Sequence, residues 1–285
     1  MSFTTLVSCA DLSAHLNDPD WRVFDCRHQL SDVEFGEKAY AEGHLPGAFF
    51  MHLDRDLSSP MTGENGRHPL PGVQRLADKL GLAGVSRTTQ VVVYDDAGAM
   101  IAGRLWWLLR WLGHDKVAVL DGGIAQWTKE GRPLATDQPA SAQTVFVAEQ
   151  REWLVSADEV LAAIENGGER GELCLVDARA PDRFRGENET LDPVGGHIPG
   201  ARNRFFRDNL APEGLFKSAP ELRKEWLEIL PEKSAESSVM YCGSGVSACH
   251  NVLALAIAGL NGARLYAGSW SEWCSDPGRP VQTNI

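Results

Sequence analysis

Val91-Val92-Val93-Tyr94-Asp95 in the first half of the chain has a counterpart in Ser238-Val239-Met240-Tyr241-Cys242 in the second half. Each stretch is a short apolar run, which is typical of a buried strand. The first run ends at an aspartate, whereas the second ends at a cysteine. A scaffold that occurs twice, with a thiol at this position in one copy, predicts one working site and one degenerate site.

The repeat extends well beyond these two strands. Its other blocks, with the first-half member given first, are Phe24-Asp25-Cys26-Arg27 with Val176-Asp177-Ala178-Arg179, Gly43-His44-Leu45-Pro46-Gly47 with Gly196-His197-Ile198-Pro199-Gly200, Asp121-Gly122-Gly123-Ile124-Ala125-Gln126-Trp127 with Ala267-Gly268-Ser269-Trp270-Ser271-Glu272-Trp273, and Gly131-Arg132-Pro133 with Gly278-Arg279-Pro280. Five blocks in one order at a nearly constant offset indicate a duplicated domain, because solenoids use shorter periods and more units. What both copies keep is scaffold: we expect the Asp-x-Arg pairs to tie strand ends to nearby loops and the His-x-Pro-Gly segments to shape bends.

Short apolar strands alternate with helices in each copy. The expected strands are 91–94, 117–120, 239–241 and 264–266, and the expected helices are 100–112, 124–130, 246–258 and a short one near 271. This alternation predicts an α/β fold in which each domain is a mainly parallel sheet with helices on both faces. We expect an N-terminal domain over 1–138, a linker over 139–151 that contains Pro139 and Ser141, and a C-terminal domain over 152–285.

The bulk composition excludes several classes of function. The chain has 43% hydrophobic and 23% charged residues, a net charge of −12 and no dense run of Lys or Arg, so we expect no binding to nucleic acid. The most apolar stretch, Leu105-Trp106-Trp107-Leu108-Leu109, is too short to span a bilayer, and the first residues lack the features of a signal peptide. Six scattered cysteines indicate reduced thiols in the cytoplasm. We also expect a monomer.

Cys242 follows the second-copy strand and precedes Gly243-Ser244-Gly245 and a long helix. It therefore belongs at the carboxyl edge of the sheet, where open α/β folds place ligands. The glycines let the loop turn backbone N–H groups inward, and the helix N-terminus adds further unpaired donors. Such a nest of donors favours the thiolate and is expected to lower a thiol pKa from about 8.5 toward neutrality. Asp95 cannot do this chemistry. The alternative is a buried structural cysteine.

The chain resembles the tandem-domain rhodanese-family sulfurtransferases over nearly its full length. Cys242-Gly243-Ser244-Gly245-Val246-Ser247-Ala248 is similar to the family's active-site loop, with Ser247 where threonine is more usual. The resemblance implies two tandem rhodanese-like domains and a Cys242 persulfide that carries sulfur from a small-molecule donor to cyanide or a thiol, with no cofactor or metal. It also implies that Gly243, Gly245, Val246 and Ser247 line the donor site.

The form of the loop points to the donor. Gly243-Ser244 looks like the branch of the family that uses 3-mercaptopyruvate, and Arg183 matches the arginine that grips the donor's anionic end. Asp54 and His68 match positions that assist the serine from across the interdomain cleft, in a Ser–His–Asp relay. One departure weakens this assignment: the segment Glu187-Asn188-Glu189-Thr190-Leu191-Asp192-Pro193-Val194 lacks the second arginine of mercaptopyruvate enzymes. Thiosulfate therefore stays open as the donor.

Three other classes of function are alternatives to a sulfurtransferase. A phosphatase of the same fold needs an arginine at position 248, which is alanine here. A docking module of this fold typically lacks the cysteine, as the first copy does. A redox sensor would pair Cys242 with Cys249. Cys242, Cys249 and His250 also make a weak metal-ligand pattern, which we do not expect to bind an ion.

Overall fold

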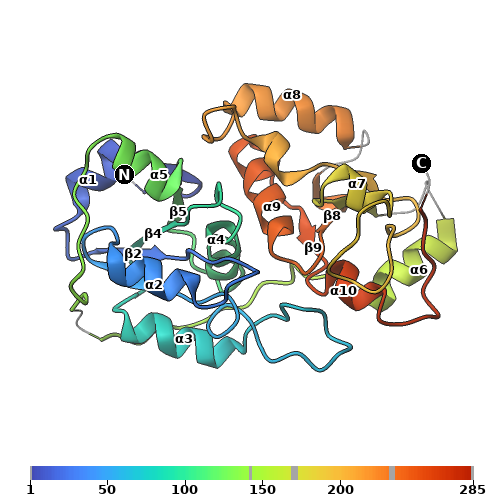
Figure 1. Ribbon diagram of the computed structural model, residues 1–285, viewed down its shortest axis with the longest axis horizontal. Coiled ribbons are helices and arrows are strands. Elements are labelled where there is room, and N and C mark those ends of the chain that lie inside the picture. Colours follow the sequence, from blue (N-terminus) through green and yellow to red (C-terminus); the bar gives the residue numbers. More distant parts are fainter. Residues whose placement is uncertain (1, 141–142, 168–172, 231–234, 284–285) are drawn as a thin grey trace. The chain divides into compact units, whose positions relative to one another are not determined.

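The computed structural model describes residues 2–140, 143–167, 173–230 and 235–283. The chain forms two compact units, Met1–Ser59 with Leu70–Glu152, and Pro60–Pro69 with Trp153–Ile285. Each unit contains one sheet of parallel strands with helices around it (Figure 1), so the predicted α/β fold in two copies is confirmed. The short segment Pro60–Pro69 belongs to the second unit although it lies in the first half of the sequence.

The first unit has a five-stranded sheet in the order β1-β5-β4-β2-β3. Its elements are β1 (Leu6–Val7), α1 (Cys9–His15), β2 (Trp21–Asp25), α2 (Phe35–Glu42), β3 (Ala48–Phe50), α3 (Val73–Leu82), β4 (Gln90–Tyr94), α4 (Ala102–Trp111), β5 (Val117–Leu120) and α5 (Gly123–Lys129). Val92 and Tyr94 of β4 pack with Leu12 of α1 and Trp127 of α5. The alternate residues of β4 point to the opposite face and are also buried, so both faces of the sheet are covered.

The second unit has a four-stranded sheet in the order β7-β6-β8-β9. Its elements are α6 (Ala157–Gly167), β6 (Cys174–Asp177), α7 (Pro181–Phe184), β7 (Arg202–Asn203), α8 (Ala219–Ile229), β8 (Ser238–Tyr241), α9 (Ser247–Ile257), β9 (Arg264–Leu265), α10 (Ser269–Trp273) and two 3-10 turns, η2 (Phe206–Asn209) and η3 (Ala235–Ser237). The strands and helices expected in this half are present, with ends that differ by one or two residues. Within the described ranges, no helix of the chain has the length and apolar character needed to cross a bilayer.

Buried ion pairs tie strand ends to turns in both units. Arg27 binds Asp25 with an Nη2–Oδ2 distance of 2.6 Å and donates to the carbonyl of Gly43 at 2.7 Å. In the second unit Arg179 makes the same two bonds, to Oδ2 of Asp177 and to the carbonyl of Gly196, both at 2.7 Å. The predicted scaffold role of the Asp-x-Arg pairs is therefore confirmed.

The described residues of the stretch expected to be a linker, 139–140 and 143–151, run along the first unit without a helix or strand. Phe146 is buried, the N–H of Thr144 donates to the carbonyl of Gly81 at 2.9 Å, and the N–H of Arg151 donates to that of Trp111 at 2.9 Å. Ser141, which the linker interpretation used, lies outside the described residues. These backbone bonds make the stretch part of the first compact unit.

Asp95 occupies a cradle of backbone amides where β4 passes into α4. Its Oδ1 accepts from the N–H groups of Ala97 and Ala99, and its Oδ2 from those of Ile101 and Ala102, all at 2.8–2.9 Å. Burial raises the pKa of Asp95 above its ordinary value, and the four N–H groups act against that rise. The degenerate copy thus keeps a cradle for an anion and fills it with its own carboxylate.

Replacing Asp95 by Ala is expected to destabilise the first unit by about 3 kcal/mol or more, because buried N–H groups would lose their acceptor. Urea unfolding followed by circular dichroism measures this cost. The exposed neighbour Asp96, changed to Ala, is the matched control and should shift the free energy of unfolding by less than about 0.5 kcal/mol. Equal effects of the two substitutions would contradict the cradle.

Candidate active site

Cys242 stands at the carboxyl end of β8, one short loop before α9. Its Sγ accepts a hydrogen bond from the N–H of Gly245 at 3.1 Å, and its own N–H donates to the hydroxyl of Ser269 at 3.1 Å. The side chain is 2% exposed. The sulfur is therefore held at the sheet edge, where the sequence predicts a reactive thiol, with a backbone donor directed at it.

Gly245 is essential to the shape of this loop. Its φ is +79°, and a Cβ at this position would lie 2.2 Å from the carbonyl oxygen of Ala267. A side chain here would both favour a different backbone conformation and collide with a neighbouring strand connection. The loop can bring the Gly245 N–H to the sulfur because this residue is glycine.

The side chain of Ser244 points to a residue far away in the sequence. Its Oγ lies 2.7 Å from Nδ1 of His68, and both side chains are buried. His68 reaches it from the Pro60–Pro69 segment of the same compact unit. Two of the residues predicted for the site are thus in hydrogen-bond contact.

Two guanidinium groups border the Cys242 loop. Arg183 comes from α7, and Arg67 comes from the Pro60–Pro69 segment. A Cβ built on Gly243 would lie 2.8 Å from Nη2 of Arg67 and 3.6 Å from both Nη atoms of Arg183. The residue after the cysteine therefore has no side chain where two cationic groups come close.

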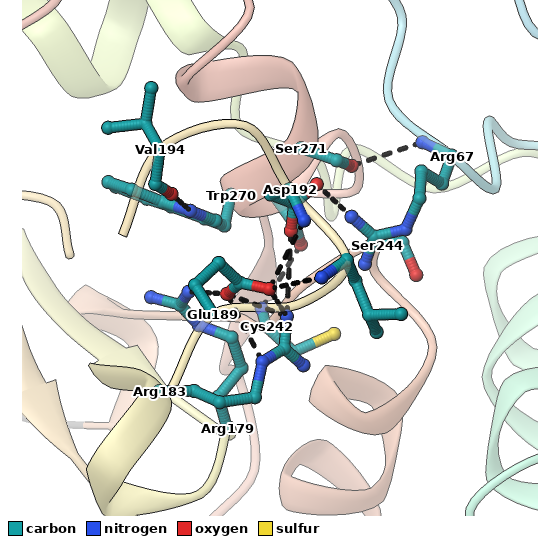
Figure 2. A network of polar contacts seen from close by, with 12 residues as sticks. Arg67, Arg179, Arg183, Glu189, Asp192, Val194, Cys242, Ser244, Trp270 and Ser271 are labelled. Carbon is teal, nitrogen blue, oxygen red and sulfur yellow. Dashed lines mark hydrogen bonds and ion pairs between the residues drawn. The ribbon is translucent and has the colours of Figure 1, made fainter. Parts of the chain in front are cut away.

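Two buried carboxylates neutralise these arginines (Figure 2). Glu189 accepts from Nη2 of Arg183 at 2.8 Å, and Asp192 binds Nη1 of Arg67. Burial by itself raises the pKa of Glu189, but the Arg183 hydrogen bond and backbone donors bring it below its ordinary value. For Asp192 burial prevails over the ion pair with Arg67, so its pKa is raised.

The remaining predicted site residues lie in three places. Val246 is buried just before α9, and Ser247 is the first residue of that helix. Asp54 belongs to the first compact unit, where its Oδ2 lies 4.0 Å from Nε2 of His28. The proposed relay between Asp54 and His68 stays a prediction.

The metal-ligand pattern around Cys249 and His250 is occupied by other contacts. Cys249 Sγ donates to the carbonyl of Gly245 at 3.3 Å, and the His250 ring stacks on Phe216 with centroids 4.7 Å apart.

A different group among the described residues, His28, His52 and Asp54 of the first unit, has ligand atoms within 4.8 Å of one another. Both ring nitrogens of His52 face backbone groups, Nε2 the carbonyl of Val33 at 2.9 Å and Nδ1 the N–H of Asp54 at 3.1 Å. A metal ion would have to break one of these bonds, so the group does not fit one well.

One protein-family model matches both halves of the chain. The model of the rhodanese-like domain matches residues 8–130 and again 156–276. The chain belongs to the rhodanese family. Each match contains one of the two strand-end loops, the first with Asp95 and the second with Cys242.

Individual relatives carry two kinds of name. A Pseudomonas aeruginosa protein named "Probable 3-mercaptopyruvate sulfurtransferase" is 46% identical over 286 residues, which cover 99% of each chain. The thiosulfate sulfurtransferase of Gallus gallus is 36% identical over 88% of this chain and 86% of its own. The solved structure of 3-mercaptopyruvate sulfurtransferase from Leishmania major superposes with a TM-score of 0.82 at 30% identity and covers 95% of this chain and 74% of that one.

Sequence reasoning missed four residues of this neighbourhood: Arg67, Glu189, Asp192 and Ser269. Arg67 is the residue before His68, which the sequence did single out. The positive charge of Arg67 next to a predicted site residue could have indicated that it also lies at the site. Asp192 stands in the segment noted for lacking an arginine, and no pattern indicates that its carboxylate turns toward Arg67.

Replacing Gly245 by Ala is expected to destabilise the protein by about 2 kcal/mol or more and to abolish sulfur transfer, because the loop must move away from Cys242. Urea unfolding and a turnover assay measure the two effects. Gly200→Ala is the matched control, since its φ is +76° and no atom lies within 4 Å of the added Cβ. Similar losses in both variants would mean that φ alone, and not the contact with Ala267, determines the result.

Proposed function

We propose that this chain is a sulfurtransferase that takes a sulfur atom from 3-mercaptopyruvate and passes it through a Cys242 persulfide to cyanide or a thiol. The observation that carries the proposal is the sulfur of Cys242 at the β8–α9 junction, with the Gly245 N–H at 3.1 Å and the Ser244–His68 pair in the same loop. The 46% identity with a protein named for this activity supports the choice of donor.

In the first step the Cys242 thiolate attacks the thiol sulfur of the donor. The new S–S bond forms as the donor's carbon–sulfur bond breaks, and the electron pair of that bond passes to carbon as the enolate of pyruvate. Protonation of the enolate carbon releases pyruvate and leaves Cys242–S–SH. In the second step the persulfide loses its proton to solvent and cyanide attacks the outer sulfur. The S–S bond breaks, thiocyanate leaves, and the electron pair of that bond restores the Cys242 thiolate.

The loop supplies electrostatic help at both steps. The N–H of Gly245 stabilises negative charge on the Cys242 sulfur before attack and after release. Ser244, held by His68 at 2.7 Å, is placed to hydrogen-bond the keto oxygen on which enolate charge develops. Arg183 binds the donor carboxylate, and Asp54 is proposed to orient His68.

Thiosulfate is the second candidate donor, because a relative of 36% identity is named for it and the 187–194 segment lacks the second arginine of mercaptopyruvate enzymes. Attack on its outer sulfur would give the same persulfide and release sulfite. Comparison of kcat/KM for the two donors decides between them. We further propose that the enzyme works in the cytoplasm as a monomer; its six free cysteines support a reducing compartment.

Cys242→Ser is expected to abolish turnover and persulfide formation, since the hydroxyl does not ionise near neutral pH. Intact-protein mass spectrometry after incubation with 3-mercaptopyruvate should show the mass of one sulfur atom added to the wild type and none on the variant. Cys174→Ala, which removes a thiol on β6, should keep the added sulfur. If no donor adds sulfur to the wild type, a docking module becomes the better interpretation, and a disulfide between Cys242 and Cys249 on mild oxidation would instead indicate a redox sensor.

His68→Ala is expected to lower kcat with 3-mercaptopyruvate by about 10²-fold and to affect thiosulfate turnover much less. The physical reason is the leaving group: sulfite departs as a stable anion, whereas the pyruvate enolate needs a hydrogen bond and a proton. Steady-state kinetics with both donors provides the measurement. His15→Ala, a half-exposed histidine of α1, is the control, and equal losses with the two donors would remove His68 from this role.

A further inference from the structure

Ser271 on α10 joins the two parts of the chain that carry the Ser244–His68 pair. Its N–H donates to the carbonyl of Gly243 at 2.9 Å, and its Oγ accepts from the N–H of Arg67 at 3.0 Å (Figure 2). Gly243 is the residue before Ser244, and Arg67 is the residue before His68. One buried serine therefore binds the main chain immediately before each member of the pair.

The hydroxyl of Ser271 acts as a donor and as an acceptor. It donates to the carbonyl of Gly268 at 3.3 Å, so its lone pairs are left to receive the Arg67 N–H. A Cβ on Gly66 would lie 2.7 Å from the same carbonyl oxygen and 3.2 Å from Oγ of Ser271. The segment therefore lies directly against the start of α10, and this contact fixes the position of the main chain at Arg67.

The outer part of the Pro60–Pro69 segment is shaped by a bond within the segment. Residues 61–64 are exposed, and the N–H of Thr62 donates to Oδ1 of Asn65 at 2.8 Å. Such a bond determines the shape of the loop but does not fix where the loop lies relative to Ser244. That placement needs a contact outside the segment.

The hydrogen bond between His68 and Ser244 depends on this placement. Nδ1 and Oγ are 2.7 Å apart, and hydrogen bonds weaken steeply as their geometry departs from the optimum. Consecutive Cα atoms are about 3.8 Å apart, so a shift of the main chain at Arg67 carries the His68 ring with it. A misplacement of about 1 Å can lower a rate by about 10²-fold.

We propose that Ser271 is a positioning residue for sulfur transfer, which keeps His68 and Ser244 in hydrogen-bond contact by binding the main chain before each of them. This inference rests on the proposed function, because that function gives the pair its role at the keto oxygen of the donor. The N–H and Oγ of Ser271 are engaged by the protein. Ser271 therefore acts through the pair and not on the donor.

Ser271→Ala removes the hydroxyl and keeps the N–H that binds Gly243, so the Cys242 loop should stay in place. With 3-mercaptopyruvate kcat should fall about tenfold while KM stays within about twofold. With thiosulfate kcat should change little, because sulfite leaves without help from the pair. Ser275→Ala is the matched control: it removes a hydroxyl just after α10 that donates to the carbonyl of Glu272 at 2.8 Å, and it should leave kcat with both donors unchanged.

A second pair of variants moves the segment from the opposite side. Gly66→Ala places a methyl group against the carbonyl of Gly268 and should give the same loss of kcat with 3-mercaptopyruvate alone. Gly63→Ala is its control, since its φ is +96° and no atom of the described residues lies within 4 Å of the added Cβ. Both variants share the backbone strain, and only Gly66→Ala disturbs the contact with α10. Circular dichroism checks that every variant is folded.

Nitrogen NMR of the protein labelled with ¹⁵N-histidine tests the link without turnover. In Ser271→Ala and in Gly66→Ala the Nδ1 resonance of His68 should move toward its position in Ser244→Ala. In the two control variants it should stay where it is in the wild type.

The outcomes separate this inference from the proposed function. If the wild-type enzyme takes no sulfur from 3-mercaptopyruvate, the proposed function fails and the role of Ser271 in it fails too. If the wild type uses 3-mercaptopyruvate but neither kcat nor the His68 resonance responds to Ser271→Ala, the function stands and this inference is overturned. Equal losses of kcat with the two donors would also overturn it, because Ser271 would then support the whole Cys242 loop and not the pair.

Discussion

Backbone N–H groups at a strand-to-helix junction need acceptors, and this requirement shapes both strand-end loops of the protein. A helix leaves its first N–H groups without partners inside the helix, and a buried unpaired donor is costly. In the first unit the carboxylate of Asp95 accepts from four N–H groups, those of Ala97, Ala99 and Ile101 before α4 and that of Ala102 at its start. In the second unit the Cys242 sulfur meets the N–H of Gly245. One scaffold therefore holds two different groups that can carry negative charge, a carboxylate in the first unit and a thiol in the second.

Buried arginine–aspartate pairs hold the strand ends next to these junctions. In each unit an arginine holds a strand-end aspartate and reaches the carbonyl of a glycine in the following turn. Arg179 also lies 4.8 Å from the ring centroid of Trp270 on α10, the helix that begins at Ser269 and so supports the N–H of Cys242. The position of the sulfur thus depends on a chain of contacts that starts in the core of the sheet. Both copies keep the buried pair, although only one copy has the thiol.

Much of this arrangement could be read from the sequence because it is local or repeated. The strand that ends at Cys242, the helix that follows, and the Asp-x-Arg pairs all follow from short patterns that occur twice. Arg67 and Asp192 could not be found in that way. Each becomes important through a partner more than a hundred residues away, and neither has a counterpart in the repeat. The cradle around Asp95 was also missed: Gly98, φ +66°, marks the turn, but the left-handed conformation of the next residue, Ala99, φ +70°, is not one that an alanine predicts.

An enzyme with a net charge of −12 must attract an anion with local positive charges. In the second unit the guanidinium groups of Arg67 and Arg183 lie beside Gly243, and each is paired with a carboxylate, Asp192 and Glu189 respectively. The pairing keeps this group of charges close to neutral, which limits the cost of burying it. The same arginines that neutralise the buried carboxylates are therefore the local positive charges that lie beside the Cys242 loop.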